Sequence, residues 1–174
     1  KAIIFDLGLS SLQLSDEKRG FSFNSNSPLN MKMGFNEYSA YDVINNLERK
    51  RLGNLIKTLG DEKLGRNIAN KIVKYRNEKP IKNTNELVSI IKEVKGNYSK
   101  FKKNPATKTF QAIRISVNQE LTELILGLIA ATKLLNQGGV LIVLSFHSLE
   151  DKIVKNFIRL NSSYNKNPSR YLPK

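Results

Sequence analysis

Three polar residues lie at or just after the ends of apolar runs near the two ends of the chain. Asp6 follows the run at residues 1–5, and Ser145 and His147 follow the run at residues 140–144. Short apolar runs rich in β-branched residues are typical of buried parallel strands, and ligands of such sheets bind at the carboxyl ends of the strands. If the two strands are neighbours, their ends lie ~5 Å apart, and the three side chains surround one crevice.

Each of these residues also has a purely structural alternative. Asp6 could cap the turn that follows it, and His147 could pack near the N-terminus of the next helix. A Ser/His/Asp hydrolase is disfavoured because there is no G-x-S-x-G motif, and because Ser145, His147 and Ser148 are too close in sequence to form a triad. There is also no Walker loop and no G-x-G-x-x-G motif to bind nucleotide phosphates.

The elements around these residues follow the order of a doubly wound α/β sheet. Apolar positions with a helical period predict a helix over residues 118–136, which the glycines at 138 and 139 end. After the second strand, Ser148 is expected to cap a last helix, with Asp151 as its third residue. The order strand, crossover, helix, strand, helix is typical of this fold class.

The middle of the chain predicts four amphipathic helices. One begins at the capping pair Ser39 and Asp42, and another ends at Gly60. A third carries apolar residues over 64–75, and a fourth begins at Asn83. We therefore expect a helical insert between two halves of an α/β sheet.

Charge is concentrated in the same middle region. The 174 residues carry 29 basic and 15 acidic residues, a net charge of +14, and residues 18–107 alone hold 19 basic and 8 acidic residues. This excess favours a polyanionic partner, either nucleic acid or an anionic membrane. Zero cysteines and one histidine exclude a disulfide framework and make a metal site unexpected. No apolar run approaches 18 residues, so no membrane-spanning helix is expected.

Three longer segments resemble one enzyme family. Residues 6–14 (DLGLSSLQL), followed by 19–23 (RGFSF) and 28–33 (PLNMKM), are similar to the first signature of the RsmH (MraW) family. Residues 104–121 (NPATKTFQAIRISVNQEL) and 145–155 (SFHSLEDKIVK) are similar to its second and third signatures. Members of this family are S-adenosylmethionine-dependent methyltransferases that act on N4 of a cytidine in small-subunit (16S) rRNA.

The resemblance implies a fold, a cofactor and a partner. It implies a partial Rossmann-like class I methyltransferase domain, made of residues 1–17 and 108–174, and an inserted basic helical domain at 18–107 that faces RNA. S-adenosylmethionine is the implied cofactor, and 16S rRNA of the small ribosomal subunit is the implied partner. The family is cytoplasmic, and a monomer and a homodimer both stay open as assembly states.

The resemblance also suggests roles for individual residues. Asp6 and Gln13 correspond to cofactor-contacting positions, and catalytic candidates beside Asp6 are Ser10, Ser11 and His147. Candidates for contacts with substrate or RNA are Arg19, Phe21, Phe23, Lys32, Lys102, Lys103, Arg114, Asn118 and Ser145. The two phenylalanines could instead anchor loops, and Arg114 and Asn118 could orient the Asp6 loop or serve only the structure.

One competing class is a basic helical module that binds ribosomal RNA without chemistry. The charge supports both classes equally, whereas the three signatures at strand ends favour the enzyme. The family's glycine-rich cofactor motif is expected upstream of Lys1. The isolated 174-residue chain is therefore expected to bind RNA, to bind S-adenosylmethionine weakly and to be inactive alone.

Overall fold

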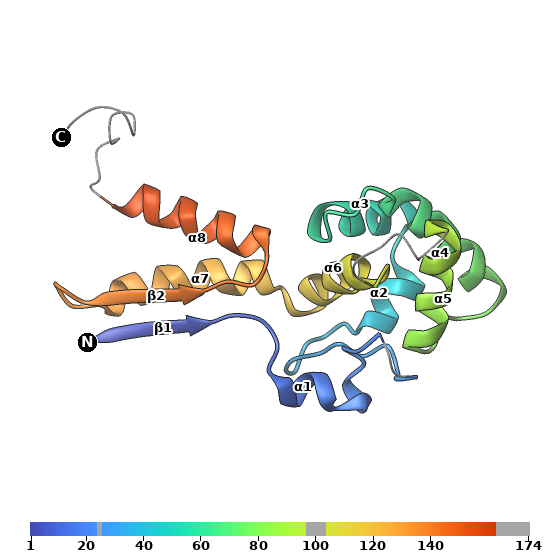
Figure 1. Cartoon of the computed structure of the whole chain (residues 1–174), viewed down its shortest axis with the longest axis horizontal. Coiled ribbons are helices and arrows are strands. Elements are labelled where there is room, and N and C mark those ends of the chain that lie inside the picture. Colours follow the sequence, from blue (N-terminus) through green and yellow to red (C-terminus); the bar gives the residue numbers. More distant parts are fainter. Residues whose placement is uncertain (24–25, 97–103, 163–174) are drawn as a thin grey trace. The chain divides into compact units, whose positions relative to one another are not determined.

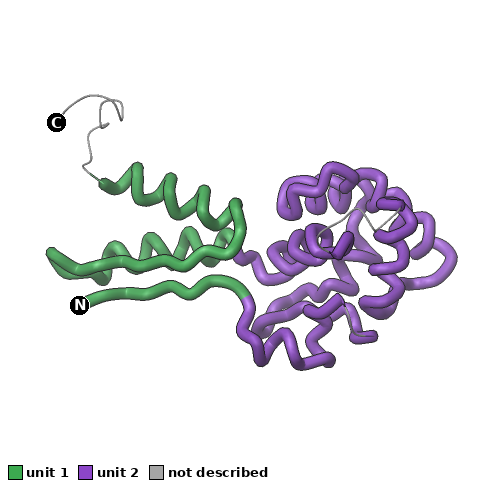
Figure 2. Tube along the Cα trace, viewed as in Figure 1, with its two compact units in different colours: residues 1–8, 121–174 green, residues 9–120 purple. Residues whose placement is uncertain are grey.

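A computed structural model describes residues 1–23, 26–96 and 104–162 of the chain. They belong to two compact units, which are coloured separately in Figure 2. Unit 1 combines residues 1–8 with residues from 121 onward, and unit 2 comprises residues 9–120. The middle of the chain thus forms one unit, and segments from both sides of it form the other.

Unit 1 contains two parallel strands, β1 (Ala2–Asp6) and β2 (Val140–Leu144), as Figure 1 shows. Asp6 pairs in register with Leu144, so the two strands end side by side. This confirms the prediction that the strands are parallel neighbours. Two long helices, α7 (Glu120–Leu134) and α8 (Ser148–Asn161), flank β2 in sequence.

The sheet packs through one of its two faces. Phe5 and Val143 belong to an apolar cluster with Leu128 of α7 and Val154 of α8. On the opposite face, Ile4 is 63% exposed and Ile142 is 43% exposed. The sequence predicted buried strands, but in the described residues only one face of each strand is covered, because successive side chains alternate between faces and the cluster covers only one.

Two helix boundaries differ from the prediction. The helix expected to begin at Asn118 begins at Glu120, because Gln119 takes a left-handed conformation (φ 49°) that ends the preceding helix. The residue that caps α8 is His147 rather than Ser148, and the third residue of this helix is Glu150 rather than Asp151.

Unit 2 is built mainly from helices, and its core also includes residues from the loops between them. It contains α1 (Ser11–Ser15), a 3₁₀ turn η1 (Glu17–Arg19), α2 (Ala40–Asn46), α3 (Arg49–Leu59), α4 (Gly65–Glu78), α5 (Thr84–Lys95) and α6 (Thr107–Asn118). The four predicted helices of the middle region are confirmed as α2 to α5. Ser39 and Asn83 cap α2 and α5, and α3 ends at Gly60, as the sequence predicted.

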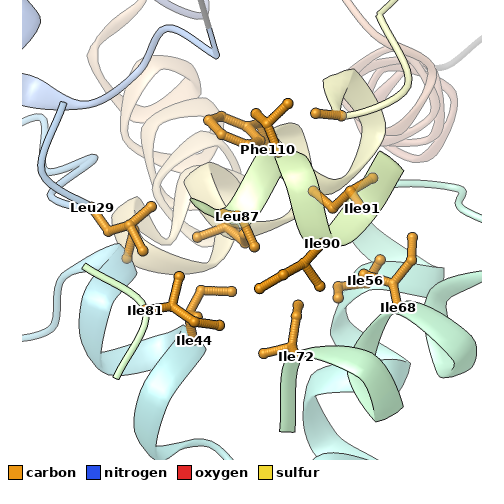
Figure 3. Close-up of a cluster of buried hydrophobic side chains, with 14 of the residues drawn as sticks. Leu29, Ile44, Ile56, Ile68, Ile72, Ile81, Leu87, Ile90, Ile91 and Phe110 are labelled. Atoms are coloured by element: carbon orange, nitrogen blue, oxygen red, sulfur yellow. The ribbon is translucent and has the colours of Figure 1, made fainter. Parts of the chain in front are cut away.

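The core of unit 2 is an apolar cluster that draws on α2 to α6. Figure 3 shows this packing around Leu29, Ile44, Ile56, Ile68, Ile72, Ile81, Leu87, Ile90, Ile91 and Phe110. Helix α6 packs against α2 and α3, and Ile113 and Val117 are buried in the same cluster as Phe110. Because α6 supplies part of this core, the compact unit extends to Glu120, beyond the boundary at residue 107 that the sequence predicted.

The unit also begins earlier than predicted. It starts at Leu9, which packs against its core, whereas the sequence placed the boundary between residues 17 and 18. Within the part of the chain that the structure describes, no helix is both long enough and apolar enough to cross a membrane.

Candidate functional site

Asp6 lies at the carboxyl end of β1, where ligands bind in open parallel sheets. The strand pairing continues one step beyond it, because the Leu7 N–H donates to the Leu144 carbonyl at 3.2 Å. The Asp6 carboxylate is exposed, and it forms no ion pair or hydrogen bond with a described residue. A free carboxylate in this position can accept hydrogen bonds from ribose hydroxyls or from amino groups, which fits a nucleoside cofactor.

Gly8 redirects the chain after the strand. Its φ of +93° lies in the region that glycine adopts readily and that other residues rarely adopt. A Cβ at this position would also lie 3.5 Å from the Phe146 ring, in ordinary contact. The glycine of the D-L-G segment is therefore required for its backbone conformation.

Ser145 and His147 follow the end of β2. Ser145 is exposed, and His147 is the N-cap of α8. The His147 Nδ1 accepts the backbone N–H of Glu150 at 3.4 Å, and Nε2 lies 3.2 Å from the Glu150 Oε1. The structural alternative for His147, a histidine at a helix N-terminus, is the arrangement that the structure contains.

Glu150 was not predicted as a site residue, although its carboxylate organises this loop. It is buried, and Oε2 accepts the N–H of Phe146 at 2.9 Å and that of His147 at 3.4 Å. Burial alone raises the pKa of Glu150, but the hydrogen bonds from His147 and from the Phe146 backbone outweigh it and hold the pKa below 4.5. The signal in the sequence was a capping box, which the prediction placed one residue too late.

Ser10 and Gln13 form a capping box at the start of α1. The Ser10 N–H donates to the Gln13 Oε1 at 3.0 Å, and the Gln13 N–H donates to the Ser10 Oγ at 3.2 Å. Ser11, the first residue of α1, is exposed. The Gln13 side chain also lines a pocket of about 360 Å³ with Asp16 and Arg19, and its NH₂ group forms no hydrogen bond with a described residue.

The two phenylalanines act as anchors of the unit 2 core. Phe21 is only 6% exposed and belongs to the apolar cluster. Phe23 packs edge-on against Phe110, with ring centroids 5.9 Å apart. Of the two alternatives that the sequence left open, the structure contains loop anchoring, and the buried Phe21 ring offers no face on which a base could stack.

Asn118 ties the loop before α2 to α6. Its amide NH₂ donates to the carbonyls of Met31 and Arg114 at 2.8 and 2.9 Å, and its Oδ1 accepts the Met33 N–H at 2.7 Å and the Asn36 Nδ2 at 2.5 Å. All donors and acceptors of this buried side chain are thus used within unit 2. This geometry is the structural role that the sequence left as one alternative.

Arg114 forms a bidentate ion pair with Glu120. Its Nε and NH2 groups each lie 2.8 Å from a carboxylate oxygen, and both side chains are largely buried. The guanidinium is therefore engaged within the protein rather than presented to a phosphate. Like Asn118, Arg114 serves the structure of unit 2 in this conformation.

The other predicted RNA contacts are basic side chains. Arg19 lies 3.5 Å from Asp16 in a half-exposed pair, and the Lys32 ammonium donates to the Glu37 carbonyl at 3.3 Å. Both retain exposed area. Lys102 and Lys103 lie outside the described residues.

The chain is similar to known proteins over nearly its whole length. Residues 1–173 match the family model described as the MraW methylase family. The chain belongs to the MraW methylase family. It is 49% identical over 154 residues to ribosomal RNA small subunit methyltransferase H of Ehrlichia canis (strain Jake), which covers 88% of this chain and 52% of that protein.

Other relatives give the same result. The protein of the same name from Caulobacter sp. (strain K31) is 43% identical over 171 residues, 98% of this chain and 53% of the relative. That of Rickettsia canadensis (strain McKiel) is 48% identical over 160 residues, 92% of this chain and 52% of the relative. The chain therefore spans about half the length of the relatives it matches.

Proposed function

We propose that this chain acts in methyl transfer from S-adenosylmethionine to N4 of a cytidine in small-subunit rRNA. The single observation that carries the proposal is family membership over residues 1–173, together with the position of the family's D-L-G motif in the fold. The motif ends β1 with an exposed carboxylate beside the end of β2. The relatives described above carry the name ribosomal RNA small subunit methyltransferase H.

The chemistry at N4 explains what the protein must supply. The N4 lone pair is delocalised into the pyrimidine ring, so the amino group is a poor nucleophile. The cofactor supplies an activated methyl group on its sulfonium. The protein can accept hydrogen bonds from the amino protons and hold nitrogen, methyl carbon and sulfur in line. The target base must also leave its stack to reach such a site.

The roles of the residues follow from their geometry and from the resemblance. Asp6 would hold the cofactor and accept a hydrogen bond from it, and Gln13 would contribute its free NH₂ group. Ser10, Ser11 and Ser145 are exposed and can offer hydroxyl groups to the base. Because both ring nitrogens of His147 face Glu150, we assign it the positioning of the loop that carries Ser145.

The basic residues of unit 2 would bind ribosomal RNA. Phosphate contacts from Lys and Arg supply affinity without sequence information, and the affinity falls steeply with salt. Lys32 and Arg19 are members of this set, whereas Arg114 and Asn118 hold the segments that carry it. We therefore propose that unit 2 is the helical RNA-binding part of the molecule.

Nucleoside analysis tests the reaction. A strain that lacks its small-subunit rRNA methyltransferase H would be complemented with the complete gene that contains the coding sequence of this chain, and its 16S rRNA would be digested and analysed by mass spectrometry. Recovery of N4-methylcytidine supports the proposal. Recovery of 5-methylcytidine instead, or of no new modification with a well-expressed protein, contradicts it.

The second candidate is an RNA-binding module without chemistry, and the concentration of positive charge favours it equally. Titration of the 174-residue chain with S-adenosylmethionine separates the two for this chain. We expect RNA binding together with weak or undetectable cofactor binding. Micromolar cofactor binding would show that residues 1–174 contain a complete cofactor site.

A further inference from the structure

A set of exposed cations gathers where α3 and α4 cross. Lys50 and Lys57 lie on α3, Lys63 lies in the loop between the helices, and Arg66 lies in the first turn of α4. All four are exposed. We call these four residues together the α3–α4 basic groove, a name for this set of side chains and not for a cavity. None of them belongs to the site residues described above.

Two glycines bring the helices unusually close at this point. A Cβ on Gly53 would lie 3.3 Å from the Arg66 Cα, and a Cβ on Gly65 would lie 2.8 Å from the Lys57 backbone nitrogen. The contact at Gly53 would be tighter than ordinary packing, and the contact at Gly65 would require the backbone to move. The contact fixes Lys57 and Arg66 on facing turns of α3 and α4.

Helical geometry places Lys50 on the same face of α3 as Lys57. Residues seven apart differ by only about 20° around a helix, so Lys50 and Lys57 share one face of α3, about 10 Å apart along its axis. That face adjoins Gly53, which contacts α4. Lys63 lies in the loop between the two helices, two residues before Gly65, which contacts α3. The cations therefore line one side of the helix pair.

The neighbouring acidic residues form ion pairs with cations outside the groove. Glu62 is buried and paired with Lys95, whose ammonium also donates to the Pro105 carbonyl at 2.6 Å. Asp61 pairs with Lys108 at 3.1 Å. By contrast, the four cations of the groove form no ion pair with a described residue. Their charge is therefore uncompensated at this surface.

A second ion pair accounts for the acid at the other end of the groove. Glu48, the residue before α3, lies 4.0 Å from Arg51. Arg51 lies about 100–120° around α3 from Lys50 and Lys57. Glu48 is thus paired with a cation outside the groove.

We propose that the α3–α4 basic groove binds the sugar-phosphate backbone of RNA, an inference that rests on the proposed function. The exposed side chains beside the cations include two polar amides, Asn54 on α3 and Asn70 on α4, and one apolar side chain, Leu64, which is 36% exposed. Amides can hydrogen-bond to phosphate and ribose oxygens. A membrane-binding helix needs an exposed apolar face beside its cations, and Leu64 alone does not make such a face.

The salt dependence of RNA binding tests the groove. The variant K50Q/K57Q/R66Q of the 174-residue chain would be compared with the unchanged chain, using a fluorescently labelled transcript of a small-subunit rRNA helix. Loss of three phosphate contacts should lower the slope of log Kd against log salt concentration by about 2 to 3. Affinity at low salt should fall by at least tenfold.

A matched variant controls for net charge. K82Q/K133Q/K152Q removes the same three charges from exposed positions elsewhere in the chain. It should leave the slope within about 1 of the unchanged chain. Equal losses in both variants would mean that only total charge matters, and would overturn the proposal. Thermal unfolding and circular dichroism of both variants confirm that they are folded.

Two further outcomes separate this inference from the proposed function. If the unchanged chain binds the transcript and the groove variant behaves like its control, the groove assignment fails and the RNA partner stands. If the unchanged chain does not bind RNA, both fail. Binding to vesicles of phosphatidylcholine and phosphatidylserine that the groove variant alone loses, with RNA binding intact, would overturn the proposal in favour of a membrane surface.

Discussion

His147 and Glu150 cap each other at the start of α8. The imidazole Nδ1 accepts the Glu150 N–H, and the Glu150 carboxylate accepts the His147 N–H, each at 3.4 Å. The same carboxylate accepts the Phe146 N–H at 2.9 Å. The segment that joins the end of β2 to α8 is thereby fixed from both sides.

We predict that Glu150→Gln destabilises unit 1 in a pH-dependent way. The pKa of Glu150 is lower in the folded state, so the folded state binds fewer protons and this residue stabilises it above the ordinary value of 4.5. The contribution is lost as the pH falls through the lowered pKa. At pH 7 the variant should lose about 1–3 kcal/mol of unfolding free energy. Urea titrations between pH 7 and pH 3 should show the two proteins converging at low pH.

Asp151→Asn provides the control on the same helix. Asp151 pairs with Lys155 at 2.8 Å in a solvent-exposed i, i+4 arrangement. Such pairs contribute about 0.3–0.5 kcal/mol, so the change should be small. A loss for Asp151→Asn as large as that for Glu150→Gln would contradict the special role of the buried carboxylate.

Asn118→Asp should destabilise unit 2 although the two side chains have the same shape. The Asn118 NH₂ group donates to the carbonyls of Met31 and Arg114, and a carboxylate would face both of these oxygens without a proton. We expect a loss of roughly 2–4 kcal/mol at pH 7, measured by urea unfolding. Hydrogen exchange at the Met33 amide should accelerate in the variant. Asn54→Asp, at an exposed position, should change stability by less than about 0.5 kcal/mol.

Sequence reasoning found those elements whose signals are local. The caps at Ser39 and Asn83, and the end of α3 at Gly60, were predicted because short-range hydrogen bonds and chain reversal determine them. The neighbouring parallel strands were expected because parallel crossovers commonly join neighbouring strands, but the register that pairs Asp6 with Leu144 was not predicted. These predictions needed no tertiary information.

The remaining features depend on partners that are distant in sequence. Helix α6 was missed because it is buried on most sides, so its apolar residues lack the one-sided period of a surface helix. The hydrogen bonds from Asn118 to Met31 and Met33 join residues more than 80 positions apart, and no local sequence pattern predicts them. The roles of Phe21 and Arg114 were likewise decided by packing and pairing in the folded chain.

Gly20→Ala should be among the most destabilising single substitutions in unit 2. Gly20 has a φ of +68°, and a Cβ there would lie 2.1 Å from the Pro28 carbonyl oxygen, which belongs to the backbone. The loop that leads to Phe21 would have to move, at an expected cost of more than about 3 kcal/mol. Gly34→Ala meets no atom within 4 Å and should be nearly neutral in the same unfolding assay.

Arg114 and Glu120 should behave as a coupled pair. Removing either partner alone leaves a largely buried charge without its partner, so Arg114→Gln and Glu120→Gln should each cost about 3 kcal/mol or more. The double variant should be more stable than the sum of the two losses predicts, with a coupling of roughly 1–3 kcal/mol. Additive losses would show that the ion pair contributes little.

The last prediction concerns Asp6 and separates function from stability. Its carboxylate is exposed and has no partner among the described residues, so Asp6→Asn should change the unfolding free energy by less than about 0.5 kcal/mol. In the complemented strain, however, the same variant should lower methylation of 16S rRNA, because a charge-assisted hydrogen bond contributes about 1.5–3 kcal/mol, or roughly tenfold to a hundredfold in rate. Glu123→Gln, which changes another exposed carboxylate of unit 1, is the matched control and should leave methylation unchanged. Methylation that is unaffected by Asp6→Asn would remove this residue from the site, and a large loss of stability would show that its role is structural.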